Sequence, residues 1–329
     1  MNLDCIVFPS PNSTYAYDNI ERGELLYIPK STTINSERTV DTVSHSSNIN
    51  NNGSSSSCSC SNSNNDINNK IRYIPCLLVR ANQSALSNQK YALFFHGNAE
   101  DINLSYEMLN HIRFTLNINV IAPEFPGYGI YHGYPKEEQL FQDSLSVYDY
   151  MTKQLGIPPS NIIVFGRSIG TSIATYLASQ RKATALVLIS PPLSIRYVVR
   201  DMLGKFISYT VCDRFKNYKF IEEVQCPILI IHGQSDSLIK YYHATELYNR
   251  AKAPCELILP ENMEHNEFDF YHEFSEPLLD FLSRNAIFAN TEKCNLEFPL
   301  SLFEAPEEFK VQPKNWNCLT WFLQKLNFN

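Results

Sequence analysis

Short runs of apolar, often β-branched residues recur along the chain, and segments with apolar residues at helical spacing follow several of them. Continuous apolar runs of this kind are typical of strands buried on both faces of a parallel sheet. Strands that alternate with helices predict an α/β fold, with a mostly parallel central sheet flanked by helices. The pattern predicts strands at 23–29, 71–79, 91–95, 161–165, 185–189, 227–231 and 255–260, and helices at 171–180, 195–207, 241–250 and from 268 onwards.

The sequence GRSIG at 166–170 joins the strand predicted at 161–165 to the helix predicted at 171–180. A small-x-Ser-x-small turn between a strand and a helix is typical of the nucleophile elbow of α/β-hydrolases. The sharp turn accepts only small residues two positions either side of the serine. It exposes the hydroxyl at the carboxyl end of the strand, beside a helix N-terminus that favours negative charge. The pattern therefore predicts an α/β-hydrolase fold with Ser168 as the nucleophile.

An acid and a base follow the serine in the order that this fold requires. Asp236 lies in the loop after the strand at 227–231, and His265 lies in the loop after the strand at 255–260. The base activates the serine hydroxyl by taking its proton, and the carboxylate fixes the imidazole tautomer. We therefore predict that Ser168, Asp236 and His265 form a catalytic triad.

Each partner of the serine has a structural alternative. Asp236 is also suited to capping the helix that follows it, and His265 to an ordinary surface position. His272 and His243 compete with His265, although both fall inside predicted helices rather than on the loop. The neighbouring strand at 185–189 ends in a Ser-Pro-Pro sequence without a carboxylate, which favours Asp236 as the acid.

Two backbone N–H groups are predicted to form an oxyanion hole, which holds the negative charge that develops during acyl transfer. One belongs to Ile169, directly after the nucleophile. The other belongs to Asn98, or less favourably to Ala99, in the HGNA turn after the third predicted strand. We expect His96 in this turn to be a hydrogen-bonded structural residue, and Asp101 to cap the next helix or brace the loop.

The segment at 191–225 is short for a lid, with one amphipathic helix predicted at 195–207. Such a minimal cap predicts an open, shallow site that suits an acyl chain presented on a protein or an amphiphile. The apolar residues of the segment either line an acyl groove or, as ordinary helices do, face the core. They are Leu193, Val198, Met202 and Phe206.

Five sequence blocks resemble the α/β-hydrolase-domain-17 family of protein depalmitoylases and the wider Bem46-like group of serine hydrolases. The blocks are HGNAED (96–101), PGYG (126–129), GRSIGT (166–171), PILIIHGQSD (227–236) and EHNEF (264–268). The similarity spans residues 71–282 and implies that Ser168, Asp236 and His265 are nucleophile, acid and base. The chain departs from the family in three places: Glu124 and its neighbours, the approach to the histidine at 262–264, and the lack of an amino-terminal cysteine cluster.

The resemblance implies a serine hydrolase that cleaves acyl thioesters or esters, with S-palmitoyl proteins as the favoured substrates. The alternative is a lipid or small-molecule esterase, such as a lysophospholipase, a monoacylglycerol lipase or a carboxylesterase. A serine peptidase and an inactive binding module are less favoured. The expected partner is an acylated protein or a lipid or ester substrate, and we expect neither a cofactor nor a metal ion.

Charge and cysteine content bear on partners and compartment. A net charge of −7 argues against nucleic acid as a partner. The first residues lack the features of a signal peptide, and no window approaches the ~18 apolar residues of a membrane-spanning helix. Nine scattered cysteines, without a signal peptide, are typical of reduced thiols, so we expect a cytoplasmic protein. The resemblance to the depalmitoylases adds the expectation of peripheral association with a membrane.

Composition divides the chain into four parts. Residues 1–31 are expected to supply amino-terminal strands of the hydrolase domain, and 32–70 form an Asn- and Ser-rich insertion predicted to be disordered. Residues 71–284 are the predicted catalytic domain, and 285–329 are an extension expected to dock on the core. The candidates for membrane attachment are Cys5, the pair Cys58 and Cys60, and the aromatic segment at 316–323.

Overall fold

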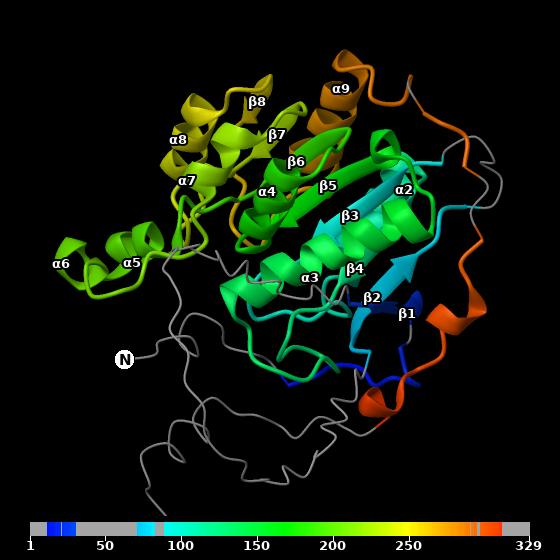
Figure 1. The fold of residues 1–329 in the computed structure, drawn as a ribbon. Helices are drawn as coiled ribbons and strands as arrows, with labels where there is room; N and C mark the ends of the chain where they lie inside the picture. Colours follow the sequence, from blue (N-terminus) through cyan, green and yellow to red (C-terminus); the bar gives the residue numbers. More distant parts are fainter. Residues whose placement is uncertain are drawn as a thin grey trace, which may run out of the picture.

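An eight-stranded sheet forms the centre of the protein (Figure 1). The computed structural model describes residues 12–20, 22–30, 71–82, 89–289, 291–294 and 297–310. The strands lie side by side in the order β1-β2-β4-β3-β5-β6-β7-β8. Their bounds are β1 (Glu24–Pro29), β2 (Tyr73–Val79), β3 (Tyr91–Phe95), β4 (Asn119–Pro123), β5 (Ile162–Arg167), β6 (Ala185–Ile189), β7 (Ile228–Ile231) and β8 (Cys255–Ile258).

The strands from β4 to β8 are all parallel, whereas β2 is antiparallel to both of its neighbours, β1 and β4. The carboxyl ends of β1 and of all the parallel strands therefore meet at one edge of the sheet, which we call the carboxyl edge. The predicted, mostly parallel sheet is confirmed. β3 and β6 have the predicted bounds, whereas β4 was not predicted.

Helices cover both faces of the sheet. In Figure 1, α3 and α4 lie on the near face and pack on each other, and α2 and α9 lie on the far face. Covering both faces buries β3, β5, β6 and β7 almost completely, which explains their continuous apolar runs. The bounds are α2 (Tyr106–Leu116), α3 (Glu137–Asp149), α4 (Gly170–Gln180), α5 (Ile195–Leu203), α6 (Lys205–Ser208), α7 (Asn217–Phe220), α8 (Tyr242–Arg250), the π-helix η4 (Phe270–Ser275) and α9 (Glu276–Arg284).

The cap differs from its prediction in two respects. The single helix expected at 195–207 is two short helices, because Gly204 between them has a φ of 90° that α-helices do not contain. The expectation that this segment faces the core is wrong for Met202 and Phe206, which are 60% and 89% exposed, although Leu193 is buried. Figure 1 shows the reason: α5 and α6 project from the body of the protein.

The described part of the carboxyl-terminal extension lies against the β1 side of the sheet. Phe309 is buried, and its ring lies 5.2 Å from that of Tyr27 on β1. The insertion at 32–70 with Cys58 and Cys60, the residue Cys5 and the aromatic segment at 316–323 lie outside the described residues. Within the described ranges, no helix has the length and apolar character needed to cross a membrane.

Candidate active site

Ser168 occupies a strained turn at the carboxyl end of β5. Its φ of 52° lies in the left-handed region, which residues other than glycine rarely adopt and which is often found at functional sites. Neighbouring backbone holds the turn in place. The Ser168 N–H donates to the carbonyl oxygen of Ile189 on β6 at 2.9 Å, and the hydroxyl of Thr171 donates to the Ser168 carbonyl oxygen at 2.6 Å.

Close backbone contacts explain the small residues on both sides of the serine. A Cβ atom at Gly166 would lie 2.6 Å from the carbonyl oxygen of Gly170 and the Cα of Thr171. A Cβ atom at Gly170 would overlap the carbonyl oxygens of Phe95 and His96. The second contact brings the start of α4 directly against the end of β3, so the loops after β3 and β5 meet at the carboxyl edge.

The structure brings the three predicted residues together from the ends of three strands. His265 Nδ1 lies 2.7 Å from Asp236 Oδ2, and His265 Nε2 lies 3.2 Å from Ser168 Oγ. All three side chains are largely buried, each residue being between 5% and 8% exposed. The result is a continuous hydrogen-bonded chain from a carboxylate through an imidazole to a hydroxyl.

The two carboxylate oxygens of Asp236 accept hydrogen bonds from different groups. Oδ2 accepts from His265, while Oδ1 accepts the backbone N–H groups of Leu238 and Ile239 at 2.9 and 2.8 Å. These N–H groups belong to the turn before α8, which begins at Tyr242, so Asp236 braces this turn and does not cap the helix. His232, directly after β7, adds a further contact, with Nε2 at 3.3 Å from Oδ2.

The ionisation of Asp236 fixes the tautomer of His265. Burial alone would raise the pKa of Asp236, but its hydrogen bonds with His232 and His265 and with the backbone of Ile239 hold the pKa well below its usual range. An ionised carboxylate only accepts hydrogen bonds, so the Nδ1 of His265 must carry the proton. In the neutral ring, Nε2 is then left to accept the proton of the Ser168 hydroxyl.

The two residues predicted for the oxyanion hole lie on the adjoining loops. Ile169 follows Ser168 at the N-terminus of α4, and Asn98 follows the end of β3. The Asn98 side-chain oxygen accepts a hydrogen bond from the Tyr128 hydroxyl at 2.7 Å, which anchors this residue to the loop after β4. Ala99, the less favoured donor, is exposed and has a φ of 59°.

Arg167 joins three loops of the site, and it was not predicted from the sequence. Its guanidinium contacts Glu100 at 3.1 and 3.3 Å, the carbonyl oxygen of His265 at 3.0 Å and Oδ1 of Asn266 at 2.7 Å. Glu100 also accepts the N–H of Gly97 at 2.6 Å. We call Arg167 and Glu100 the brace, because they connect the serine turn, the loop after β3 and the histidine loop.

His96 is fully buried and is a structural residue, as expected. Its Nε2 lies 3.1 Å from Oε1 of Glu124, a residue at one of the places where the chain departs from the family pattern. Glu124 also accepts the Tyr15 hydroxyl at 2.8 Å. Asp101 braces the same region, because it accepts the backbone N–H groups of Thr14 and Leu104 at 2.8 and 2.9 Å.

The competing histidines lie elsewhere. His272 is on η4 with a 68% exposed side chain, and its contact is Glu276 at 3.5 Å. His243 is buried on α8, where Nδ1 accepts the N–H of Leu193 and Nε2 lies 3.0 Å from Asp201. Among the described residues, no group of three His, Cys, Asp or Glu side chains is placed to hold a metal ion.

Comparisons with known proteins agree on the fold. A family model described as the alpha/beta hydrolase fold matches residues 93–206. The chain is 32% identical over 216 residues to alpha/beta hydrolase domain-containing protein 17B of Homo sapiens, covering 65% of this chain and 72% of that protein. It is 31% identical over 214 residues to alpha/beta hydrolase domain-containing protein aho-3 of Caenorhabditis elegans, covering 65% of this chain and 62% of that protein.

Solved structures give a more distant match. Est1E from Butyrivibrio proteoclasticus has a TM-score of 0.51 at 18% identity, with 65% of this chain and 95% of that chain covered. An esterase from Pyrococcus furiosus has a TM-score of 0.50 at 20% identity, with 64% and 85% covered. At this level of identity the match concerns the fold.

Proposed function

Because the chain belongs to the family of alpha/beta hydrolase domain-containing protein 17, we propose that it is a serine hydrolase that cleaves acyl thioesters or esters. The observation that carries this proposal is the hydrogen-bonded chain from Asp236 through His265 to Ser168. We propose further that S-acylated proteins are its preferred substrates. The positions of these three side chains give the steps of the reaction.

In the first half of the reaction, the Ser168 oxygen attacks the carbonyl carbon of the thioester while its proton moves to Nε2 of His265. Asp236 stabilises the imidazolium that forms. The negative charge on the carbonyl oxygen is held by the backbone N–H groups of Ile169 and Asn98. Collapse of this intermediate breaks the carbon–sulfur bond, and His265 returns its proton to the leaving thiolate, which departs as a cysteine thiol.

In the second half, water cleaves the acyl-enzyme. His265 takes one proton from the water as its oxygen attacks the acyl carbon, and the tetrahedral oxyanion is held at the same two N–H groups. The bond to the Ser168 oxygen then breaks and the proton of His265 goes to that oxygen. A free fatty acid leaves, and the site returns to its starting state.

An exposed apolar surface supports an acylated substrate at a membrane. Met202, Leu203, Phe206 and Tyr209 on and beside α5 and α6 are each at least 59% exposed. The segment that carries them leaves the sheet at Ile189, whose carbonyl oxygen accepts the Ser168 N–H, so it starts beside the site. Exposed apolar patches of this kind mark contact surfaces for apolar partners. We therefore propose that the enzyme associates peripherally with membranes, in the cytoplasm that its scattered cysteines predict.

Two substrates with the same acyl chain test the function. Purified protein is assayed on an S-palmitoyl peptide and on a matched O-palmitoyl ester, and labelled in parallel with a fluorophosphonate. We expect turnover of the thioester and labelling at Ser168, and both should be lost in Ser168→Ala. Ser179→Ala, a change at the other end of α4, is the matched control and should retain both activities.

The outcomes separate the candidate functions. A higher kcat/KM on the ester than on the thioester would favour the lipid or small-molecule esterase. Labelling or turnover that survives Ser168→Ala would refute the assignment of the nucleophile. An absence of turnover and labelling in the unchanged protein would favour the inactive binding module.

A further inference from the structure

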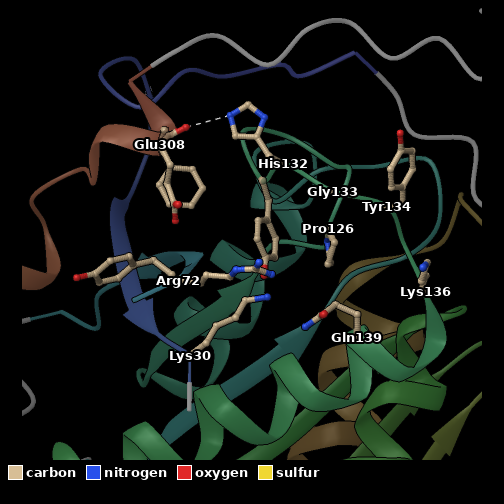
Figure 2. Close-up of a pocket in the computed structure, with 12 residues that line it drawn as sticks. Lys30, Arg72, Pro126, His132, Gly133, Tyr134, Lys136, Gln139 and Glu308 are labelled. Carbon is tan, nitrogen blue, oxygen red and sulfur yellow. Dashed lines mark hydrogen bonds between the residues drawn. The ribbon is translucent and has the colours of Figure 1, made fainter. Parts of the chain in front are cut away.

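A cavity of about 340 Å³ opens between the ends of β1 and β2, the loop at 126–136 and the short turn η6 (Glu307–Phe309) (Figure 2). We call it the cationic pocket, because Lys30, Arg72 and Lys136 line it against one acidic lining residue, Glu308. Figure 2 shows the Lys30 and Arg72 side chains converging on its centre, with Lys136 on the opposite wall. None of these residues takes part in the proposed reaction.

At the floor of the cationic pocket, the positive charge of Lys30 is balanced by the negative charge of Asp143. Lys30 Nζ lies 3.0 Å from Oδ1 of buried Asp143. The same carboxylate accepts the Tyr131 hydroxyl and the Gln139 amide, both at 2.7 Å. Its charge is therefore neutralised and its oxygens are occupied, so Asp143 offers little repulsion to an incoming anion.

The other two cations are available to a ligand. Over the ranges that the structure describes, Arg72 and Lys136 are exposed and neither makes an ion pair. Arg72 presents a planar fork of donors that suits the oxygens of a phosphate, and Lys136 adds a point charge. On a chain with a net charge of −7, a local cluster of cations attracts anions that the rest of the surface repels.

The position and size of the cationic pocket limit the class of ligand that it can bind. Pro29 pairs with Tyr73, and Cys76 pairs with Pro123, so the pocket lies at the carboxyl edge, the same edge as Ser168. Its volume is near the lower end of small-molecule sites, which span roughly 300–1,000 Å³, and exceeds what an isolated phosphate ion fills. The rings of Tyr73 and Phe309 line the remainder and suit the carbon skeleton of an attached group.

We propose that the cationic pocket binds the phosphate group of a small phosphate ester, with Arg72 and Lys136 as its principal ligands. Two sources share this chemistry, a soluble phosphate ester and the headgroup of a phospholipid. A headgroup at this edge would orient the carboxyl edge, and Ser168 with it, towards a bilayer.

The test is a binding measurement that needs no catalytic turnover. The full chain is titrated by calorimetry with glycerol 3-phosphate and, as the uncharged match, with glycerol. In a second arm it is sedimented with phosphatidylcholine vesicles that contain or lack phosphatidic acid. The double variant R72Q/K136Q removes two charges at the cationic pocket. The double variant K182Q/K252Q removes two charges from exposed lysines before β6 and β8, at the opposite edge of the sheet.

We expect R72Q/K136Q to bind at least about tenfold more weakly, because it can no longer form two charge-assisted hydrogen bonds to the phosphate. The K182Q/K252Q control should bind as the unchanged protein does. Binding of glycerol 3-phosphate with this pattern supports a soluble ligand, and the same pattern confined to phosphatidic acid vesicles supports a headgroup. Absence of binding in both arms overturns the proposal, as does an equal loss in both double variants. Because both arms measure binding and not turnover, and neither double variant changes a residue of the triad, failure of this proposal is distinguishable from failure of the proposed reaction.

Discussion

Replacing Arg167 with glutamine tests whether the brace sets the geometry of the site. The substitution removes the guanidinium contacts to Glu100, to the carbonyl oxygen of His265 and to Asn266. The hydrogen bond most sensitive to this change is the one between His265 Nε2 and Ser168 Oγ, which at 3.2 Å is already long. A displacement of roughly 0.5 Å would carry it beyond the range in which a hydrogen bond forms.

The size of the effect can be worked out from the hydrogen bonds that Arg167 makes. A hydrogen bond to a charged group contributes about 1.5–3 kcal/mol. If the transition state is deprived of one such contribution, kcat falls about 10- to 150-fold. The guanidinium of Arg167 is already engaged by Glu100, His265 and Asn266, so KM should change little. Arg167→Lys should recover part of kcat, because an ammonium reaches Glu100 but cannot also hold two acceptors on the histidine loop.

The assay is steady-state kinetics on a soluble ester, with melting temperatures measured on the same preparations. Arg181→Gln is the matched control, since Arg181 makes an equivalent pair with Asp149 at 2.8 Å beyond the far end of α4. Both variants should lose some stability, and only Arg167→Gln should lose kcat. Equal kcat values for the two variants would show that the brace is an ordinary ion pair.

Four further substitutions probe other parts of the structure. Gly233→Ala should lower stability by about 1–3 kcal/mol and impair turnover, because a Cβ there overlaps the carbonyl oxygen of Met263; a calorimetric melt with an unchanged temperature would contradict this. His265→Gln should abolish turnover of a soluble ester, whereas His272→Gln should retain most of it; the reverse result would exchange their roles. Burial lowers the pKa of His243 from 6.5 to about 4 despite its carboxylate partner, so the unfolded chain binds the proton more readily. About 3 kcal/mol of stability should therefore be lost as the pH falls from 6.5 to 4, and denaturant titrations of His243→Gln should show a flatter profile than those of the unchanged protein.

The sequence best predicted the strands that are buried on both faces and the residues that follow their carboxyl ends. Continuous apolar runs of this length are too short for a buried helix, so β3 and β6 could be delimited from length and apolar character together. The order of strands then places Ser168, Asp236 and His265 at a common edge, because parallel strands all end there. Predicting that these three side chains meet needed no knowledge of the loops themselves.

The cap and the brace could not be predicted for different reasons. The apolar stripe of α5 and α6 is the same whether it faces the core or the solvent, and only the tertiary structure decides between them. Gly204 disfavours helix and so indicated a break. The apolar periodicity continues across it, however, and favoured a single helix. Arg167 and Glu100 lie 67 positions apart, and they meet because β3 and β5 are neighbours in the sheet. The contact between His232 and Asp236 was easier to anticipate, because His232 lies only four residues before Asp236 in the same loop.

Because the two oxygens of Asp236 accept from different groups, one substitution at this position can keep the fold of the turn and remove the chemistry. An asparagine there can still accept the N–H groups of Leu238 and Ile239 through its amide oxygen, so the turn keeps its shape. Its NH₂ group would face His265 and donate to Nδ1, which forces the proton onto Nε2 and leaves no acceptor for the hydroxyl of Ser168. Asp236→Asn should thus be a folded protein that holds its substrate without turning it over, with a rate loss on the order of 10⁴. Such a variant would serve to capture the natural substrates of this enzyme from cells.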